Sequence, residues 1–357
     1  MQGRLPRRIT IRDVAMRAEV SVSTVSRVLN DYPFVDERTR ERVRRAASDL
    51  GYLPDETARS MRTGLSRAVG LVVDDISNPL FSALAKGADE VLQPSSYSLV
   101  LANSQCDIER EARVIAMLKQ RRVDALLVAL VDEAVPSLRD LLSGFQATVV
   151  LDRDPRSVVC DAVWPDHAAG MRQALDYLIE LGHVRIGLVA GRATQRGSRL
   201  RVKTFREHLH SRDATLVDEF VRTGDPTPEA GYLAARDLLE RARPPTAIIA
   251  GGNQIFVGVV SATRDLGVSI PGELSIVTCD EVDASRLTEP PTDVIDRDVV
   301  GMGRAAAELA LARLDDPGAA PRRRIVRTFF VPRGSAARPG SRASRVERHG
   351  HGERARD

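Results

Sequence analysis

The side chains best suited to contact a polyanion lie in a short segment near the start of the chain. Ser21, Ser23, Thr24 and Ser26 carry small hydroxyl groups, which allow a close approach to a phosphate or a base edge. Arg27 is the one long donor among them and can reach either partner. The first 67 residues hold 14 arginines against 9 acidic residues, and this basic balance also favours a polyanion. Charge alone leaves the partner open, because basic solvated surfaces are common.

Elsewhere the sequence offers little that would support catalysis or metal binding. Residues 301–306 match a loose dinucleotide fingerprint, but they lie in an Ala- and Leu-rich helical run and not in a strand-to-helix turn. The pairs His208/His210 and His349/His351 lack cysteine or acidic partners at metal-ligand spacing. We therefore expect no enzymatic activity, no metal and no cofactor.

Composition indicates a globular chain of more than one domain. With 357 residues, 43% of them hydrophobic, it can bury two or three cores. No apolar run approaches the length of a membrane span, and a polar helix follows the basic first residues where a signal peptide would be apolar. Three widely spaced cysteines fit reduced thiols. We expect a cytoplasmic protein without membrane contact.

Three short helices should position the hydroxyl and arginine side chains near the N-terminus. Thr10 with an aspartate three residues later, Ser21, and Asp36 each fit the start of a helix. In the second helix, Val25 and its neighbours at helical spacing face inward, while Arg27 lies on another face. This arrangement is typical of a helix-turn-helix, whose second helix enters the major groove of DNA. A three-helix bundle that binds protein is the alternative.

From residue 68 onward, β-rich runs alternate with helical patterns. Strands are predicted at residues 69–73, 98–102, 125–130, 148–151, 185–190, 246–250 and 274–278, and helices at 79–92, 109–121, 168–181 and 253–266. Regular βα alternation predicts parallel, doubly wound sheets, and this many units exceeds one sheet. We expect two α/β lobes with a ligand cleft at the carboxyl ends of their strands.

The N-terminal segment closely resembles the DNA-binding headpiece of the lactose-repressor (LacI/GalR) family. The resemblance is carried by residues 11–15, 20–30, 39–43 and 50–54. It implies that Val22, Ser23 and Arg27 read bases. It also implies that the DNA backbone is anchored by Thr10, Ser21, Thr24, Ser26 and Asn30.

Residues 54–64 join this headpiece to the core and are too few for a stable isolated helix. In the family, this segment forms a paired helix in the minor groove when DNA is bound, and otherwise a frayed linker is expected. The resemblance places Met61 where a leucine usually wedges between base pairs, with Ala58 packed against its symmetry mate. Methionine is apolar and flexible enough for that role.

The resemblance extends through the core to about residue 334, and this core is similar to periplasmic sugar-binding proteins. It implies a small-molecule effector site, whose residues by position are Ser77, Phe81, Asp152, Arg201, Asn253 and Asp280. Such side chains suit a polyol, because carboxylates and amides pair with vicinal hydroxyls, guanidinium groups make forked bonds and an aromatic ring supplies a face.

Three positions depart from the family pattern. Gln254 replaces a carboxylate, Cys279 replaces an aromatic residue, and Asp296 stands where glutamine is frequent. We therefore expect a small polar ligand, a sugar or related metabolite outside the commonest hexoses. Arg201 should be its main anchor.

The resulting hypothesis is a repressor that binds roughly palindromic double-stranded operator DNA as a homodimer under effector control. Its expected parts are a headpiece (1–53), a hinge (54–65), an effector-binding and dimerisation core (66–334) and a disordered Arg-rich tail (335–357). One alternative is an exported solute-binding protein, against which residues 1–64 and the missing signal peptide argue. Another is a DNA binder whose core only dimerises, with a degenerate effector site.

Overall fold

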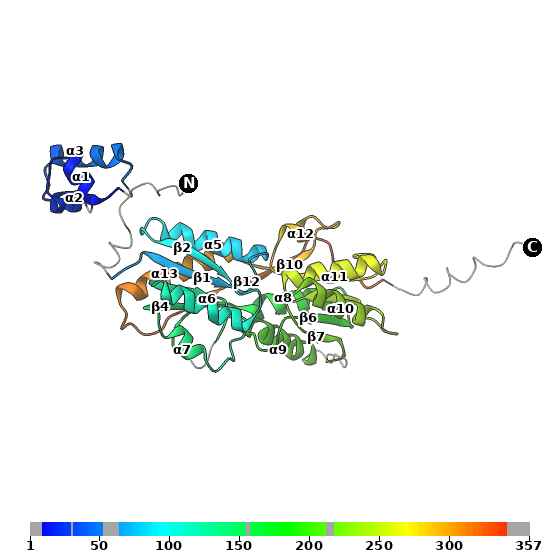
Figure 1. Ribbon diagram of the computed structural model, residues 1–357. Coiled ribbons are helices and arrows are strands. Elements are labelled where there is room, and N and C mark those ends of the chain that lie inside the picture. The colour runs from blue at the N-terminus through cyan, green and yellow to red at the C-terminus, as the bar shows by residue number, and fades with distance from the viewer. Residues whose placement is uncertain (1–8, 30, 53–63, 155–157, 212–217, 341–357) are drawn as a thin grey trace, which may run out of the picture. The chain divides into compact units, whose positions relative to one another are not determined.

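A computed structural model describes residues 9–29, 31–52, 64–154, 158–211 and 218–340. The chain divides into two compact units, Met1–Ser66 and Arg67–Asp357. The first unit is helical, and the second contains two parallel α/β sheets (Figure 1). The predicted fold class, a helix-turn-helix headpiece followed by two doubly wound lobes, is confirmed.

The N-terminal unit consists of α1 (Ile11–Arg17), α2 (Val22–Leu29) and α3 (Glu37–Asp49). Each helix begins as its sequence predicts. The Thr10 N–H and hydroxyl both donate to the Asp13 carboxylate, the Ser21 hydroxyl accepts the Thr24 N–H, and the Asp36 carboxylate accepts the Thr39 N–H. Small apolar side chains, among them Val14, Val25, Val28 and Val43, form the core between the helices.

The first lobe is built on a parallel sheet with the strand order β11-β5-β4-β3-β1-β2. One face is covered by α5 (Pro79–Leu92) and α13 (Val299–Asp315), and the other by α6 (Ile108–Gln120) and α7 (Leu138–Leu142). The strands are β1 (Ala68–Val73), β2 (Ser98–Asn103), β3 (Ala125–Val128), β4 (Ala147–Leu151), β5 (Asp161–Pro165) and β11 (Arg323–Val326).

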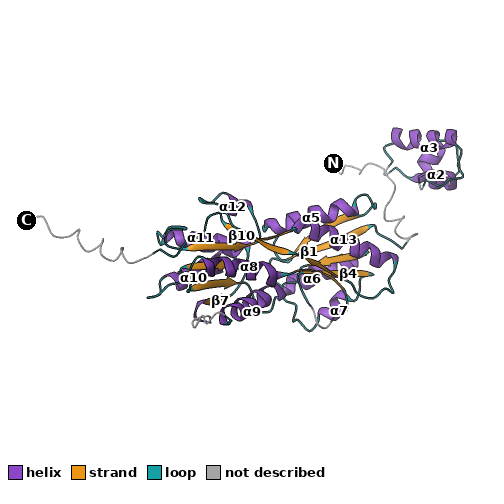
Figure 2. Ribbon diagram, turned by 180° about the vertical axis from the view of Figure 1, so that it is seen from behind, coloured by secondary structure: helices purple, strands orange, loops and turns teal. Residues whose placement is uncertain are grey.

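The second lobe repeats this plan with the strand order β12-β10-β9-β8-β6-β7, in which only the pairing of β12 with β10 is antiparallel. Helices α8 (His167–Glu180) and α9 (Arg196–His210) cover one face, and α10 (Pro228–Leu239) and α11 (Asn253–Asp265) cover the other (Figure 2). The strands are β6 (Ile186–Ala190), β7 (Val221–Thr223), β8 (Ala247–Ala250), β9 (Ser275–Cys279), β10 (Asp293–Arg297) and β12 (Thr328–Val331), with η1 (Asp218–Phe220) before β7 and α12 (Asp283–Arg286) after β9.

The polypeptide passes between the lobes three times, after β5, after β10 and after β11. Helix α13 therefore follows the strands of the second lobe in sequence but packs on α5 in the first. The packing is close: a Cβ added to Gly87 would lie 1.9 Å from the Val300 carbonyl oxygen, and one added to Gly303 would lie 2.0 Å from that of Leu84. Both positions therefore require glycine.

The core continues past the boundary expected at residue 334. Ser335 is fully buried, and its hydroxyl donates to the Ile276 carbonyl and accepts the Asp293 N–H. The Ala337 carbonyl lies 2.9 Å from His183 Nε2. The expectation of a disordered tail from 335 onward is therefore wrong for residues 335–337, because the second lobe satisfies their backbone. The expected tail from residue 341 lies outside the described residues.

Candidate functional site

Helix α2 presents an exposed face made of the predicted base-contacting residues. Val22, Ser23 and Arg27 are exposed, while Val25 and Val28 on the opposite side are buried. Ser23 and Arg27 are four residues apart and therefore lie on the same side of the helix. The face combines an apolar side chain, a hydroxyl and a guanidinium, which are groups that contact base edges in a major groove.

The predicted phosphate-contacting residues border this face. The Ser21 hydroxyl lies 2.7 Å from that of Ser23 and 2.8 Å from that of Thr24, so Ser21 holds both side chains at the start of α2. Thr10 is exposed, and Ser26 is half-buried. The remaining predicted DNA contacts, Asn30 in the headpiece and Ala58 and Met61 in the hinge, lie outside the described residues.

Two exposed aromatic residues in the turn after α2 were missed in the sequence. Phe34 is 86% exposed and Tyr32 50% exposed, and their ring centroids are 5.8 Å apart. Neither side chain belongs to the headpiece core. In the sequence, the sign that these two residues are exposed was their position in a segment predicted to be a turn.

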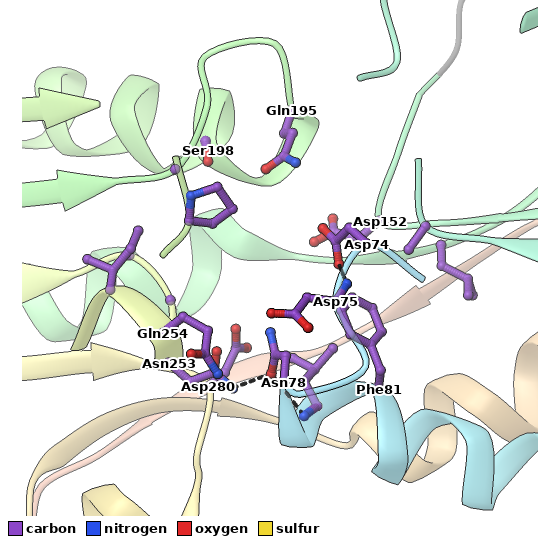
Figure 3. Close-up of a pocket in the computed structure, with 18 of the residues that line it drawn as sticks. Asp74, Asp75, Asn78, Phe81, Asp152, Gln195, Ser198, Asn253, Gln254 and Asp280 are labelled. Atoms are coloured by element: carbon purple, nitrogen blue, oxygen red, sulfur yellow. Dashed lines mark hydrogen bonds between the residues drawn. The ribbon is translucent and has the colours of Figure 1, made fainter. Parts of the chain in front are cut away.

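A cavity of about 120 Å³ lies between the two lobes of the core (Figure 3). Asp74 and Asp75 follow β1, Asp152 and Arg153 follow β4, and Asp280 follows β9, so the cavity opens at the carboxyl ends of the strands. Such a crevice is where doubly wound sheets bind ligands. The structure brings five of the six predicted effector residues into its wall: Phe81, Asp152, Arg201, Asn253 and Asp280.

The sixth predicted residue, Ser77, is not among the described residues that line the cavity. Its N–H and hydroxyl both donate to the Asp75 carboxylate, at 2.9 and 2.8 Å, so its side chain is held in an exposed turn. Asp75 and Asn78, on either side of it, line the cavity in its place. The sequence pattern locates this turn but does not determine which of its side chains points inward.

Asp152 and Asp280 occupy equivalent places in the two lobes. Each follows the strand that comes fourth in sequence within its lobe, β4 for Asp152 and β9 for Asp280. Each also has a positive φ angle, 51° and 69° respectively. Each donates its N–H to the strand that follows in sequence, Asp152 to the Val163 carbonyl and Asp280 to the Ile295 carbonyl, both at 2.9 Å. The repeated backbone geometry turns both carboxylates toward the space between the lobes.

Arg297, at the end of β10, lies between these two carboxylates. Its Nη2 is 3.0 Å from Asp280 Oδ1, and its Nη1 is 3.6 Å from Asp152 Oδ2. Sequence reasoning considered Asp296 and missed Arg297, but only Arg297 of the two lines the cavity. Successive residues of a strand point to opposite faces of the sheet. Asp296 therefore points away from the face on which Arg297 lines the cavity.

His167, at the start of α8, holds the Asp152 carboxylate, with Nε2 2.8 Å from both oxygens. Burial lowers the pKa of His167 to about 4, so the imidazole is neutral at neutral pH and its Nε2–H donates to Asp152. Burial alone would raise the pKa of Asp152, but His167 and the nearby guanidinium groups of Arg297 and Arg153 hold it well below its usual value. Asp152 is therefore an anion at every physiological pH.

Arg201 is 8% exposed and lies in α9, with Nη2 3.9 Å from Asp280 Oδ2. This separation exceeds hydrogen-bond distance, so the two groups attract each other without a close contact. A guanidinium group so placed can form a forked interaction with a ligand oxygen pair.

Several contacts join the lobes around the cavity. The Asn253 amide donates to Asn78 Oδ1 at 2.7 Å, and the Gln195 amide donates to the Val131 carbonyl at 3.1 Å. Arg199 of α9 forms an ion pair with Glu133 of the first lobe. These bonds link the same elements that line the cavity, so a bound molecule would act directly on the separation of the lobes.

Comparison with known proteins agrees with this architecture. Residues 10–55 match the model of bacterial regulatory proteins of the lacI family, and residues 175–336 match a periplasmic binding protein-like domain. Over 308 residues the chain is 33% identical to the HTH-type transcriptional repressor PurR of Pectobacterium carotovorum, which covers 85% of this chain and 90% of PurR. This chain belongs to the LacI family of bacterial transcriptional regulators.

Other LacI-family relatives agree over nearly the full length. The ribose operon repressor of Escherichia coli is 30% identical over 329 residues, which are 92% of this chain and 99% of that protein. The lac repressor dimer, solved in complex with operator and an anti-inducer, superposes with a TM-score of 0.80 at 22% identity and covers 93% of this chain and 100% of its own. The last likeness shows the fold.

The LacI family is one of regulators and not of enzymes. Within the described residues, no group of His, Cys, Asp or Glu side chains is placed to hold a metal ion. None of the helices in the described part of the chain combines the length and apolar character needed to cross a membrane.

Proposed function

We propose that this LacI-family chain is a homodimeric repressor that acts in the cytoplasm on a roughly palindromic operator, and that a small polar ligand between the core lobes controls its affinity for DNA. The observation that carries the proposal is the interlobe cavity, where carboxylate, amide and guanidinium groups from both lobes converge. The proposal is supported by relatives named HTH-type transcriptional repressor PurR and ribose operon repressor, and by a lac repressor dimer bound to operator.

We assign DNA recognition to the headpiece, residues 1–53, and to the hinge, residues 54–65. Val22, Ser23 and Arg27 would contact base edges, with Thr10, Ser21, Thr24, Ser26 and Asn30 on phosphates and Ala58 and Met61 in the minor groove. Each operator half-site would take one headpiece, so two copies of the chain are needed. Cavity residues Phe81, Asp152, Arg201, Asn253 and Asp280 would bind the ligand.

The test compares operator and random DNA over a range of salt concentrations. Affinity for both should fall steeply as salt rises, because phosphate neutralisation releases counterions. Arg27→Ala should cost about 1–3 kcal/mol on the operator and much less on random DNA, because a base contact is lost. An equal loss on both DNAs would contradict the assignment of Arg27 to a base.

Arg201→Ala is the matched variant for ligand control. It should leave ligand-free operator affinity unchanged, because Arg201 is in the core, and should abolish the response to the ligand. A ligand response at wild-type concentrations in this variant would show that Arg201 is not the anchor.

A further inference from the structure

Arg297 is a buried cation in the cavity wall whose hydrogen-bonding capacity is largely unused. Its side chain is 5% exposed. Nη2 lies near Asp280, but Nε and Nη1 have no hydrogen-bond acceptor among the described residues. Buried polar groups without partners are rare in folded proteins, and each calls for an explanation such as a missing ligand.

The charges around Arg297 do not balance. Arg201 and Arg297 of the cavity wall lie beside the Asp280 and Asp152 carboxylates. Arg196, which is not among the described residues that line the cavity, lies on the other side of Asp152, with its Nη1 3.3 Å from Asp152 Oδ1. His167, the other partner of Asp152, adds no charge at neutral pH. Three guanidinium groups therefore share two carboxylates in a space that water barely reaches, where an uncompensated charge is unfavourable.

The other charged residues of the cavity wall do not supply the missing anion. Asp74 is engaged by Arg153, whose Nη2 lies 3.5 Å from Asp74 Oδ2. Asp75 also carries a negative charge, which its hydrogen bonds from neutral Ser77 do not cancel, but among the described residues the ion pairs of Arg201 and Arg297 are formed with Asp152 and Asp280 and not with Asp75. The unmatched positive charge thus remains at the Arg201–Arg297 side of the cavity.

We propose that the effector is a polyhydroxy monocarboxylate, that is, a sugar acid, whose carboxylate binds Arg297 and Arg201 and whose hydroxyl groups bind Asp152 and Asn253. This inference rests on the proposed function and specifies its ligand. A single negative charge matches the single unmatched guanidinium group, whereas a phosphate dianion would exceed it. The planar guanidinium also fits the paired oxygens of a carboxylate.

The experiment uses the full chain and two sets of matched probes. One set is ribose, ribonate and ribose 5-phosphate, and the other is glucose, glucuronate and glucose 6-phosphate. Melting temperature and operator affinity are measured for each probe at millimolar concentration. We expect the sugar acid of one set, ribonate or glucuronate, to raise the melting temperature of the protein. Its affinity should be at least about tenfold higher than that of the neutral sugar and of the sugar phosphate in the same set.

Two variants test the role of Arg297. Arg297→Gln should lose about tenfold or more in affinity for the carboxylate while keeping or gaining affinity for the neutral sugar, and Arg297→Lys should retain most of the preference for the acid. Arg222→Gln removes a guanidinium that pairs with Asp237 outside the cavity, and it should behave as wild type.

The outcomes separate this inference from the proposed function. If a neutral sugar or a sugar phosphate bound more tightly than the sugar acid, the inference would be overturned. The proposed control by a ligand would still stand if that probe changed the affinity for operator DNA. Binding of no probe would also overturn the inference, whether or not operator DNA is bound. Loss of operator binding by the wild-type chain would instead count against the proposed function.

Discussion

At the scale of single residues, the cavity depends on how Asp152 and Asp280 are held. Positive φ angles are uncommon outside glycine, but aspartate tolerates them better than most residues. Asp152 is further fixed by His167, which contributes no charge, and by guanidinium groups, which do. The cavity therefore combines fixed acceptors with donors that remain available to a ligand.

His167 should make stability depend on pH. Its pKa is about 4 in the folded protein and about 6.5 in an unfolded chain, so the neutral imidazole is the form that folding favours. Its contribution is complete above pH 6.5 and is lost as pH falls toward 4, by up to about 3 kcal/mol. The free energy of unfolding, measured with denaturant at several pH values, should fall more steeply between pH 6.5 and 4 for the wild type than for His167→Gln. The glutamine keeps a hydrogen-bond donor for Asp152.

The same substitution at His208 provides the control for this pH dependence. His208 also pairs with an aspartate, Asp176, at 2.8 Å, but it lies away from the cavity. In His208→Gln, the free energy of unfolding should fall between pH 6.5 and 4 as steeply as in the wild type. If the free energy of unfolding of His167→Gln fell with pH as steeply as that of the wild type, another group would cause the destabilisation in acid.

At this scale the family resemblance located five residues that lie in the cavity wall, two after strands and three in helices. Phe81, Asp152, Arg201, Asn253 and Asp280 all reach the cavity wall because each sits at a fixed point of a βα unit. Ser77 was predicted but does not line the cavity, and Arg297 lines it but was missed, because the direction of one side chain in a turn and the pleat of one strand depend on tertiary packing. Whether these residues bind a ligand stays a prediction.

At the scale of elements, α6 is tied to the cavity edge by a buried acid. Glu111 is 1% exposed, and its carboxylate accepts the Val131 N–H at 2.8 Å. The Val131 carbonyl in turn accepts from Gln195 of the second lobe. Helix α6 is thus connected to the opposite lobe through the backbone of a single residue, Val131.

Glu111→Gln should stabilise the core at alkaline pH. Burial raises the pKa of Glu111 to about 7, so the contribution of Glu111 to stability is complete below about pH 4.5 and is lost as pH rises toward 7. Glutamine keeps an acceptor for Val131 without a charge, and at pH 8 the variant should be about 1–3 kcal/mol more stable than wild type. Denaturant unfolding at pH 5 and pH 8 measures the difference.

Glu109→Gln is the control on the same helix, because Glu109 is exposed. It should change stability little at either pH. A Glu111→Gln variant that is less stable than wild type at pH 8 would mean that the carboxylate is charged and fully compensated in the fold.

The sequence predicted seven of the twelve strands in the described residues and missed β5, β7, β10, β11 and β12, several of which carry charged residues. Runs such as β1 and β6 read as buried strands, whereas β10 contains Asp293 and Arg297 and β11 begins with two arginines. Oδ1 of Asp293 accepts hydrogen bonds from the N–H groups of residues 333–335, some 40 positions away. A partner so distant in sequence leaves no local periodicity to detect.

At the scale of the whole molecule, an exposed groove on the second lobe presents apolar side chains for the proposed contact with a second copy of the chain. Val257 on α11 and Leu287 after α12 line it, with exposures of 37% and 83%. Exposed apolar surface of this kind favours protein contact. A symmetric pair would bring two headpieces to one operator, as the proposed function requires.

The full chain should therefore sediment as a dimer at micromolar concentration. Leu287→Asp should shift it toward monomer and weaken operator binding, because a charge would be buried in the apolar contact. Val184→Asp, at an exposed position remote in sequence from the groove, and deletion of residues 341–357 should leave the dimer intact. A wild-type monomer that still binds operator tightly would contradict the dimer.

The three passages between the lobes also dictate the order in which the protein can be completed on the ribosome. The first lobe needs α13 and β11, which are synthesised only after nearly all of the second lobe. The headpiece, by contrast, is continuous in sequence and can fold as soon as its residues emerge. The nascent chain therefore acquires its DNA-reading helices long before its interlobe cavity. Premature termination before residue 299 would release a headpiece attached to a core that cannot close.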